Sequence, residues 1–223
     1  MEPVTERGWA TRQRLLEAAE RVFGAQDYFR AAVGDVVREA GVGQGTFYLY
    51  FGSKLDIFRE LVRWLGHELR REMKLATEGA EGRLAAELAG FEAFFAFVGR
   101  HERAYRIVKQ AETVDPVVYR EYYETLADGY RDAIAAAIAR HDYRPYRDPE
   151  AVAYMLMGIG DFLGMRYLLW EPGPLPDAVR DDLAIFLHHA LAAGAVDGGA
   201  DGNSGDGRVI GRSESGPDPP PPR

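Results

Sequence analysis

The chain has 223 residues, of which 47% are hydrophobic and 28% are charged, a composition typical of a globular protein. It contains no cysteine, which excludes disulfide bonds, thiolate metal sites and a cysteine nucleophile. The formal net charge is −8, but residues 1–74 hold 12 basic and 11 acidic residues, so the excess of acid belongs to the later part of the chain. Any contact with nucleic acid must therefore come from the local arrangement of residues and from dimerisation, because no domain is basic as a whole.

The spacing of apolar residues predicts helices along almost the whole chain, with no strand pattern of period two and no internal repeat. The expected helices cover residues 11–24, 33–40, 44–51, 54–76, 84–99, 102–113, 117–140, 148–170 and 177–193. Glycine is expected to end the first two, at Gly24 and Gly41, and Ser53 is suited to cap the helix that begins at Lys54. The fold class expected from this pattern is all-α.

One segment, residues 153–170, is apolar enough to resemble a membrane span. It is interrupted by Asp161 and Arg166, and charges near the middle of a span are costly. A buried helix is therefore expected, with Asp161 either paired with an arginine of a neighbouring helix or holding a polar group of a ligand. Because the N-terminus also lacks an apolar signal core, we expect a cytoplasmic protein with no membrane partner.

The composition changes sharply at about Val196. The following segments, DGGADGNSGDG and SGPDPPPPR, contain almost no large apolar residues. Burial of apolar surface cannot offset the entropy lost on ordering such segments, so residues 196–223 are expected to be a disordered tail.

The stretch GVGQGTFYLYFGSK, residues 41–54, places aromatic residues beside glycines on a very short element. The helix at 33–40, the tight turn at Gly41-Val42-Gly43 and the helix at 44–51 together predict a helix-turn-helix. In this motif the second helix enters the major groove of DNA, and its first residues meet base edges or phosphates. The same aromatic residues at helical spacing also suit a small buried core, and Phe47 and Phe51 are expected to face inward.

The remaining side chains of the stretch are candidates for DNA contact. Gly45 allows close approach of the backbone, and the hydroxyls of Thr46, Tyr48 and Tyr50 suit phosphates. Lys54 begins the next helix, so its ammonium and the free N–H groups of that helix are expected to share a phosphate. A glutamine can pair with adenine through two hydrogen bonds, which favours base readout at the start of the helix. The expected DNA-binding residues are Gln44, Gly45, Thr46, Tyr48, Tyr50 and Lys54.

Residues 9–62 resemble the DNA-binding domain of the TetR family of transcriptional regulators. The matching segments are TRQRLLEAAERVF, VGDVVREAGVGQGTFYLYF and SKLDIF, and the combination Gly-Thr-Phe-Tyr-x-Tyr-Phe-x-x-Lys is the most specific. The sequence departs from the family pattern at Ala31-Ala32, where a hydroxyl commonly caps the helix, at Gln44, where a basic residue is frequent, and at Leu49, where histidine is frequent. These departures suggest fewer phosphate contacts.

The resemblance implies a DNA-binding domain at 1–53 and a helical domain for ligand binding and dimerisation at 54–195, followed by the tail. It also implies a pocket for a small-molecule effector in the second domain. The density of tyrosine and methionine side chains there favours an apolar cavity, although for any one of these residues a place in the core is the more common role. The expected ligand-binding residues are Phe94, Tyr105, Tyr119, Tyr123, Met155 and Phe162. The segment MLMGIGDFLGMRYLLWE loosely resembles family members linked to acyl-CoA or aromatic compounds.

A homodimer is expected to form through a four-helix bundle built from residues 153–170 and 177–193 of each subunit. Gly158, Gly160 and Gly164 favour close helix packing, either across that interface or inside one subunit. The chain shows no nucleophile elbow, phosphate-binding loop or Glu-x-x-His motif, and His188 and His189 point about 100° apart on a helix. No enzymatic activity, cofactor or metal is expected.

The sequence thus predicts a ligand-responsive regulator, expected to be a repressor that leaves a palindromic double-stranded DNA operator when a small apolar effector binds. Two alternatives stay open. A protein of the same fold without DNA binding is compatible with the weak basic character of the first domain, and an all-α enzyme is the competing class.

Overall fold

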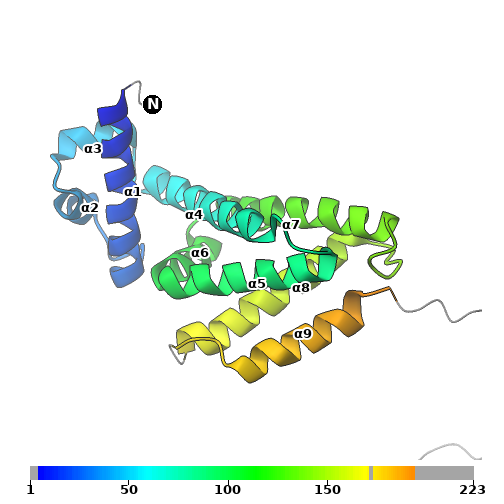
Figure 1. Cartoon of the computed structure of the whole chain (residues 1–223). Coiled ribbons are helices and arrows are strands. Elements are labelled where there is room, and N and C mark those ends of the chain that lie inside the picture. Colours follow the sequence, from blue (N-terminus) through cyan, green and yellow to red (C-terminus); the bar gives the residue numbers. More distant parts are fainter. Residues whose placement is uncertain (1–4, 171–172, 194–223) are drawn as a thin grey trace, which may run out of the picture. The chain divides into compact units, whose positions relative to one another are not determined.

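The computed structural model describes residues 5–170 and 173–193, and the tail predicted at 196–223 lies outside these ranges. The helices are α1 (Glu6–Gln26), α2 (Val33–Ala40), α3 (Gln44–Tyr50), α4 (Lys54–Thr77), α5 (Arg83–Arg100), α6 (Glu102–Val114), α7 (Pro116–Ala139), α8 (Pro149–Gly164) and α9 (Asp177–Leu191), with a π-helical segment η1 (Met165–Trp170) after α8. Within the described residues there is no β-strand, which confirms the all-α prediction. Figure 1 shows α1, α2 and α3 grouped at one end, with α4 leading from them to the other helices.

The first helix is longer at both ends than its apolar pattern predicted. Thr5 caps α1 by accepting a hydrogen bond from the backbone N–H of Gly8 at 3.1 Å, so the helix begins before residue 11. The predicted stop at Gly24 is wrong, because α1 continues to Gln26. Gly24 is buried, and a Cβ there would lie 2.5 Å from Cβ of Arg103 in α6. This glycine therefore permits close contact between two helices and does not end α1.

The turn between α2 and α3 is built as its sequence predicted. Gly41 adopts the left-handed conformation, with φ of 65°, which glycine reaches without steric cost. Its N–H donates to the carbonyl of Arg38, and the N–H of Val42 donates to that of Val37, the two bonds of a Schellman motif. At the other end of α2, Ala32 offers no side-chain cap, but the carboxylate of Asp35 accepts from the N–H of Ala32 at 2.9 Å.

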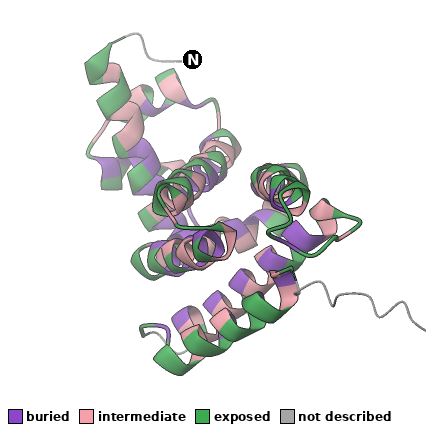
Figure 2. Ribbon diagram, turned by 45° about the vertical axis from the view of Figure 1, so that its right-hand side comes forward, coloured by how far each residue is buried: buried purple, intermediate pink, exposed green. Residues whose placement is uncertain are grey.

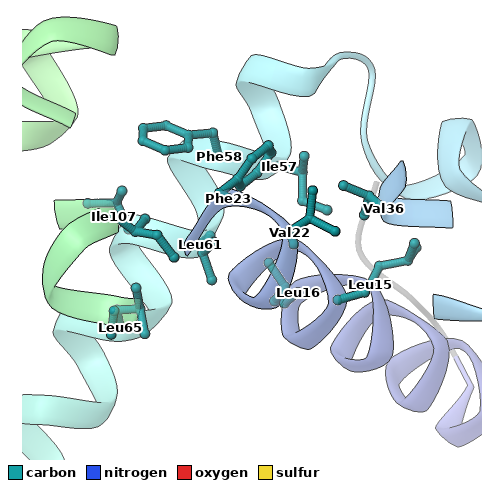
Figure 3. Close-up of a cluster of buried hydrophobic side chains, with 14 of the residues drawn as sticks. Leu15, Leu16, Val22, Phe23, Val36, Ile57, Phe58, Leu61, Leu65 and Ile107 are labelled. Atoms are coloured by element: carbon teal, nitrogen blue, oxygen red, sulfur yellow. The ribbon is translucent and has the colours of Figure 1, made fainter. Parts of the chain in front are cut away.

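One apolar cluster joins the helix-turn-helix to the helices that follow it. Figure 3 shows side chains of α1, α4 and α6 converging on this cluster, with Val36 of α2 beside them. Phe23, Phe58 and Ile107, one from each of those three helices, are fully buried. Because the same core contains residues of α1 and α6, a displacement of α6 disturbs the packing that positions α2 and α3.

The remaining helices pack around a second apolar cluster, which includes residues of α5, α7, α8 and α9. Asp115 caps α7 and Asp148 caps α8, each followed by a proline in the first helical turn. The helix predicted to reach Trp170 does so, but its last six residues are π-helical. Gly160 and Gly164 face Phe94 of α5, so they permit packing inside one subunit, the alternative left open by the sequence.

The helical stretch Pro149–Trp170 is the one stretch of the described residues that is long and apolar enough to cross a membrane by length and composition. Only a third of its most apolar window is buried within the chain, so the prediction of a buried helix holds for one face only. Figure 2 likewise shows an exposed outer face along α9, the helix that leads to the grey C-terminal trace. Apolar side chains lie on both exposed faces, including Phe162 on α8 and Phe186 on α9, and the described part of the chain leaves them uncovered.

Candidate nucleic-acid interface and effector pocket

The short helix α3 has an inward and an outward face. Phe47 is fully buried and Phe51, just after the helix, is 4% exposed, so these two rings fix α3 to the core as predicted. Gln44 and Gly45 are exposed at the start of the helix, and Tyr48 is 52% exposed one turn later. An exposed glycine and glutamine at the first turn match the geometry in which a recognition helix meets DNA.

Two predicted contact residues are only partly accessible. Thr46 and Tyr50 are half-buried, and Tyr50 packs against the core that holds α1 and α4. Leu49, by contrast, is 68% exposed and adds a large apolar side chain to the outward face. Gln44, Gly45, Tyr48 and Leu49 therefore form the accessible face of α3, and we call these four residues the α3 face.

Lys54 has a different environment from the one expected. Its ammonium donates to the carbonyls of Tyr28 and Ala31, both at 2.9 Å, and lies 4.3 Å from the centre of the Tyr28 ring. Two carbonyls and an aromatic face satisfy most of the charge from inside the protein. The lysine thus ties the segment between α1 and α2 to the start of α4, which is a positioning role.

Two arginines near the motif are also paired. Arg12 forms an ion pair with Glu60 of α4 at 2.6 Å, which holds the outer part of α1 to α4. Arg38 lies 3.2 Å from Asp35 in the same helix, and its side chain is 77% exposed. An exposed pair of this kind contributes little to stability, so Arg38 is free to exchange Asp35 for another anion at small cost.

Three of the six predicted ligand-binding residues meet inside the helical domain. Phe94, Tyr105 and Tyr123 line two adjoining small cavities, of about 40 and 20 Å³, that share Tyr122 and Asp161. Tyr119 lies beside them, with its ring 5.0 Å from that of Tyr123. Cavities of this size hold a few water molecules at most, so an organic ligand requires the surrounding helices to move.

Met155 and Phe162 were predicted to bind ligand, and the structure places them elsewhere. They are 65% and 69% exposed and do not line these cavities. The physical reason is their spacing: seven residues apart on α8, they share one face of the helix, which is turned away from the core. From the opposite face of α8, Leu156, Met157, Gly160 and Asp161 line the larger cavity.

A polar cluster crosses the cavities. Lys109 of α6 forms an ion pair with Asp161 of α8 at 2.6 Å, and the Tyr123 hydroxyl donates to the same carboxylate at 3.2 Å. The Tyr105 hydroxyl donates to the backbone carbonyl of Asp161, also at 3.2 Å. The structural ion pair expected for Asp161 is therefore present, but its partner is a lysine and not the expected arginine. We call Tyr105, Lys109, Tyr123 and Asp161 the polar cluster.

The tyrosines of this region are held in the neutral form. Burial, reinforced by the negative charge of Asp161, raises the pKa of Tyr105, Tyr122 and Tyr123 above the ordinary value for a phenol. Their hydroxyls therefore act as hydrogen-bond donors to a carboxylate or to a ligand at any physiological pH. The cavity offers these donors, one ammonium and one carboxylate in largely apolar surroundings.

A wider groove opens beside these cavities, between α4, α5 and α7, and sequence reasoning missed it. Its volume is about 590 Å³, within the range of small-molecule sites. Arg70 and Lys74 from α4 and Arg83 from α5 lie along it. The i, i+4 spacing of Arg70 and Lys74 was a usable signal. The contribution of Arg83 depends on how α5 packs against α4, which no local pattern reveals.

Sequence reasoning also missed the contact that links α6 to the motif. The side-chain amide of Gln110 donates to the carbonyl of Phe23 at 3.2 Å and accepts from the N–H of Tyr28 at 2.7 Å. Its neighbour Lys109 belongs to the polar cluster. Consecutive residues of α6 therefore contact the cavity on one side and the end of α1 on the other.

Comparison with known proteins gives consistent results. Residues 15–61 match the family model described as bacterial regulatory proteins, tetR family. An uncharacterised HTH-type transcriptional regulator of Bacillus subtilis, YdgC, is 31% identical over 170 residues, which are 73% of this chain and 84% of the relative.

Solved structures share the fold. A TetR transcriptional regulator from Chloroflexus aurantiacus superposes with a TM-score of 0.71 at 18% identity, over 85% of this chain and all of the other. The fatty acid degradation regulator FadR from Bacillus halodurans gives a TM-score of 0.72 at 15% identity, over 88% of this chain and 99% of its own. At such identities the likeness concerns the fold alone.

Proposed function

The chain belongs to the TetR family of bacterial transcriptional regulators, and we propose that it acts as a dimeric repressor that leaves its operator when a small apolar effector binds. The observation that carries DNA binding is the α3 face, which is accessible while Phe47 and Phe51 hold the helix from behind. A regulator of this kind works in the cytoplasm, where its operator lies.

DNA contact is proposed through the first turn and outward face of α3. Gln44 is placed to read a base edge, Gly45 brings the backbone near a phosphate, and the hydroxyls of Thr46, Tyr48 and Tyr50 bind phosphates. In a two-fold dimer, two such helices enter successive major grooves about 34–36 Å apart. This spacing requires a palindromic operator and makes binding sensitive to any movement of α3.

The effector is proposed to bind at the polar cluster and the aromatic rings around it. Because the small cavities must widen to admit an organic ligand, α6 and α8 have to separate or tilt where Lys109 meets Asp161. Gln110 transmits movement of α6 to the end of α1. A differential affinity of about 1–3 kcal/mol changes DNA affinity about 5- to 150-fold.

An acyl or aromatic effector fits this site. The FadR protein of Bacillus halodurans, which has the same fold, is described as a fatty acid degradation regulator. The cavity walls here include Phe94, Phe91, Leu156 and Met157, which suit an acyl chain as well as a ring.

The first experiment is selection of genomic DNA fragments by the purified protein, followed by titration of the best fragment at two salt concentrations. The proposal expects a palindromic site whose affinity falls steeply with salt, because phosphate contacts release counterions. If a folded, dimeric protein enriches no site with or without candidate effectors, the alternative of a TetR fold without DNA binding replaces the proposal.

Variants of the α3 face then test the docking geometry. Gln44→Ala should alter sequence preference at one position in each half-site, because it removes a base contact. Tyr48→Phe should weaken binding to all sequences by a similar factor and reduce the salt slope only slightly, because it removes a neutral phosphate contact. Fragment selection and titration with each variant measure both effects. If Gln44→Ala leaves the sequence preference unchanged, Gln44 is a solvent-exposed residue that does not contact a base.

A further inference from the structure

The groove between α4, α5 and α7 is lined by more cationic than anionic side chains. Cationic side chains from two helices line it, namely Arg70, Arg71, Lys74 and Arg83, whereas Glu87 is its one carboxylate. The whole chain has a net charge of −8, so the groove is locally positive on a protein that is acidic as a whole. A cleft lined by one sign of charge attracts ligands of the opposite sign.

The single carboxylate of the groove is already neutralised. Glu87 is 1% exposed and forms an ion pair with Arg83, whose side chain is 17% exposed. Burial of this pair is tolerable because each charge has its partner. Glu87 therefore does not balance the other cations of the groove.

Arg70 and Lys74 are the cations left available. Within the described residues neither side chain has an ion-pair or hydrogen-bond partner, whereas Arg71 is bound to Glu68 at 3.0 Å. Arg70 is half-buried, and its guanidinium lies near Gly66 at the wall of the groove. Two unpaired cations one helical turn apart form a site for a carboxylate or a phosphate.

The groove adjoins the apolar interior and shares side chains with it. Met73, Leu126 and Tyr130 line both the groove and the larger of the two small cavities. Beyond these three side chains the walls are mainly aromatic and aliphatic, and they end at the polar cluster. A ligand with a charged end and a long apolar end therefore finds a matching surface for each end along one path.

We propose that the effector is an amphipathic anion, whose negative head group is held by Arg70 and Lys74 in the groove while its apolar tail passes between Met73, Leu126 and Tyr130 into the interior. This inference rests on the proposed function, because it assigns the ligand class of the same regulator. A free carboxylate and the phosphates of an acyl-coenzyme A thioester share the required chemistry, so the experiment must separate these two sources.

The test is calorimetric titration of the full-length protein with three probes that share a ten-carbon chain: decanoate, decanoyl-coenzyme A and the neutral decanol. At least one of the two anions should bind about tenfold or more tightly than decanol, as charge-assisted hydrogen bonds require. The tighter of the two anions identifies the source of the charge. If decanol binds as tightly as both anions, or if none of the probes binds, the proposal is overturned.

A matched pair of variants assigns the effect to the groove. Arg70→Gln with Lys74→Gln should weaken binding of the preferred anion about 10- to 100-fold and leave decanol binding unchanged. Arg120→Gln is the control, because Arg120 is an exposed arginine of α7 that has no partner among the described residues and does not line the groove. Equal losses in the double variant and in the control would overturn the proposal, and an unfolding midpoint for each variant shows that both are folded.

Release of DNA is measured separately, so that the two proposals can fail independently. If the preferred anion binds through Arg70 and Lys74 but leaves operator affinity unchanged, the site exists and the proposed effector response is wrong. If decanol releases the operator as well as the anions do, the response exists and the assignment of an anionic effector is wrong.

Discussion

Lys54 shows how the environment of one residue changes the role that its position suggested. From its position in the motif, Lys54 was expected to contact a phosphate of DNA. In the structure its ammonium instead donates to two backbone carbonyls and lies over the ring of Tyr28. The distinction matters because a phosphate contact acts only when DNA is bound, whereas a contact inside the protein acts in the free state too.

Lys54→Met should therefore destabilise the free protein. Charge-assisted hydrogen bonds typically contribute about 1.5–3 kcal/mol, and partial exposure of this site brings the expected loss to about 1–2 kcal/mol. Chemical denaturation measures the loss. Lys74→Met is a comparison of the same kind at an exposed lysine that has no side-chain partner in the described part of the chain, and it should change stability by less than about 0.5 kcal/mol. Unchanged stability of Lys54→Met, with weaker and less salt-dependent DNA binding, would instead support the phosphate contact.

Asp115 is a second residue with two structural functions. It caps α7 by accepting from the N–H groups of Val117 and Val118, and it forms an ion pair with Arg59 of α4. Burial alone would raise the pKa of this carboxyl, but the hydrogen bond from Arg59 and those from the backbone outweigh it, so the pKa lies below the ordinary value of 3.8.

A lowered folded-state pKa means that the contribution of Asp115 to stability is present above its unfolded-state pKa and is lost as the pH falls through the folded-state pKa. Asp115→Asn keeps an acceptor for the helix cap but removes this titration. The variant should be less stable than wild type at neutral pH, and the difference should shrink below about pH 4. Denaturation at pH 7 and pH 3 measures it, and a difference that stays constant would show that the charge of Asp115 does not matter.

At the level of elements, helix positions were predictable because local chemistry determines them. Gly41, Ser53 and the Asp-Pro pairs before α7 and α8 carry their own capping signals, and the predicted boundaries there lie within about one residue of those observed. The predicted end at Gly24 failed because its glycine serves the contact with Arg103. The π-helical turns of η1 were also not predictable, since the apolar pattern continues through them unchanged.

Helix α6 makes contacts that no local sequence pattern predicts. Gln110 looks like an ordinary solvent-facing residue in sequence, yet it bridges the end of α1 and the segment after it. Its partners, Phe23 and Tyr28, lie more than 80 residues away in the chain. Only tertiary packing brings them together, as it does for Lys109 and Asp161.

Gln110→Leu should uncouple the effector site from the motif. The variant keeps the size of the side chain but leaves the N–H of Tyr28 and the carbonyl of Phe23 without this partner, which should cost about 1–2 kcal/mol. Effector affinity, measured without DNA, should change little, whereas the effector-induced loss of operator affinity should shrink. A variant that responds to the effector as wild type does would show that coupling follows another route, such as the start of α4.

For the whole molecule, the uncovered apolar surface is the main unexplained feature. Among the described residues of α8 and α9, the large apolar side chains that are exposed are Tyr154, Met155, Phe162, Ile185 and Phe186. A group of large exposed apolar side chains on neighbouring turns is typical of an interface. The proposed occupant is a second copy of the chain, because a two-fold axis beside α8 and α9 forms the expected four-helix bundle. The sequence predicted an interface on these same helices from their glycines, but Gly160 and Gly164 face Phe94 inside the subunit, so the proposal now rests on the exposed apolar side chains.

Phe162→Glu should weaken the dimer. The exposed ring would be buried between subunits, so a carboxylate in its place loses apolar contact and must be desolvated without a partner, which should raise the dissociation constant at least tenfold. Sedimentation velocity over a range of concentrations measures the change.

Phe29→Glu is the matched control, because Phe29 is 67% exposed, almost as much as Phe162 at 69%, but lies before α2. The operator requires two recognition helices at fixed spacing, so Phe162→Glu should also bind the full palindrome more weakly, whereas its affinity for an isolated half-site should remain unchanged. An unaltered dimer would place the two-fold interface on another surface.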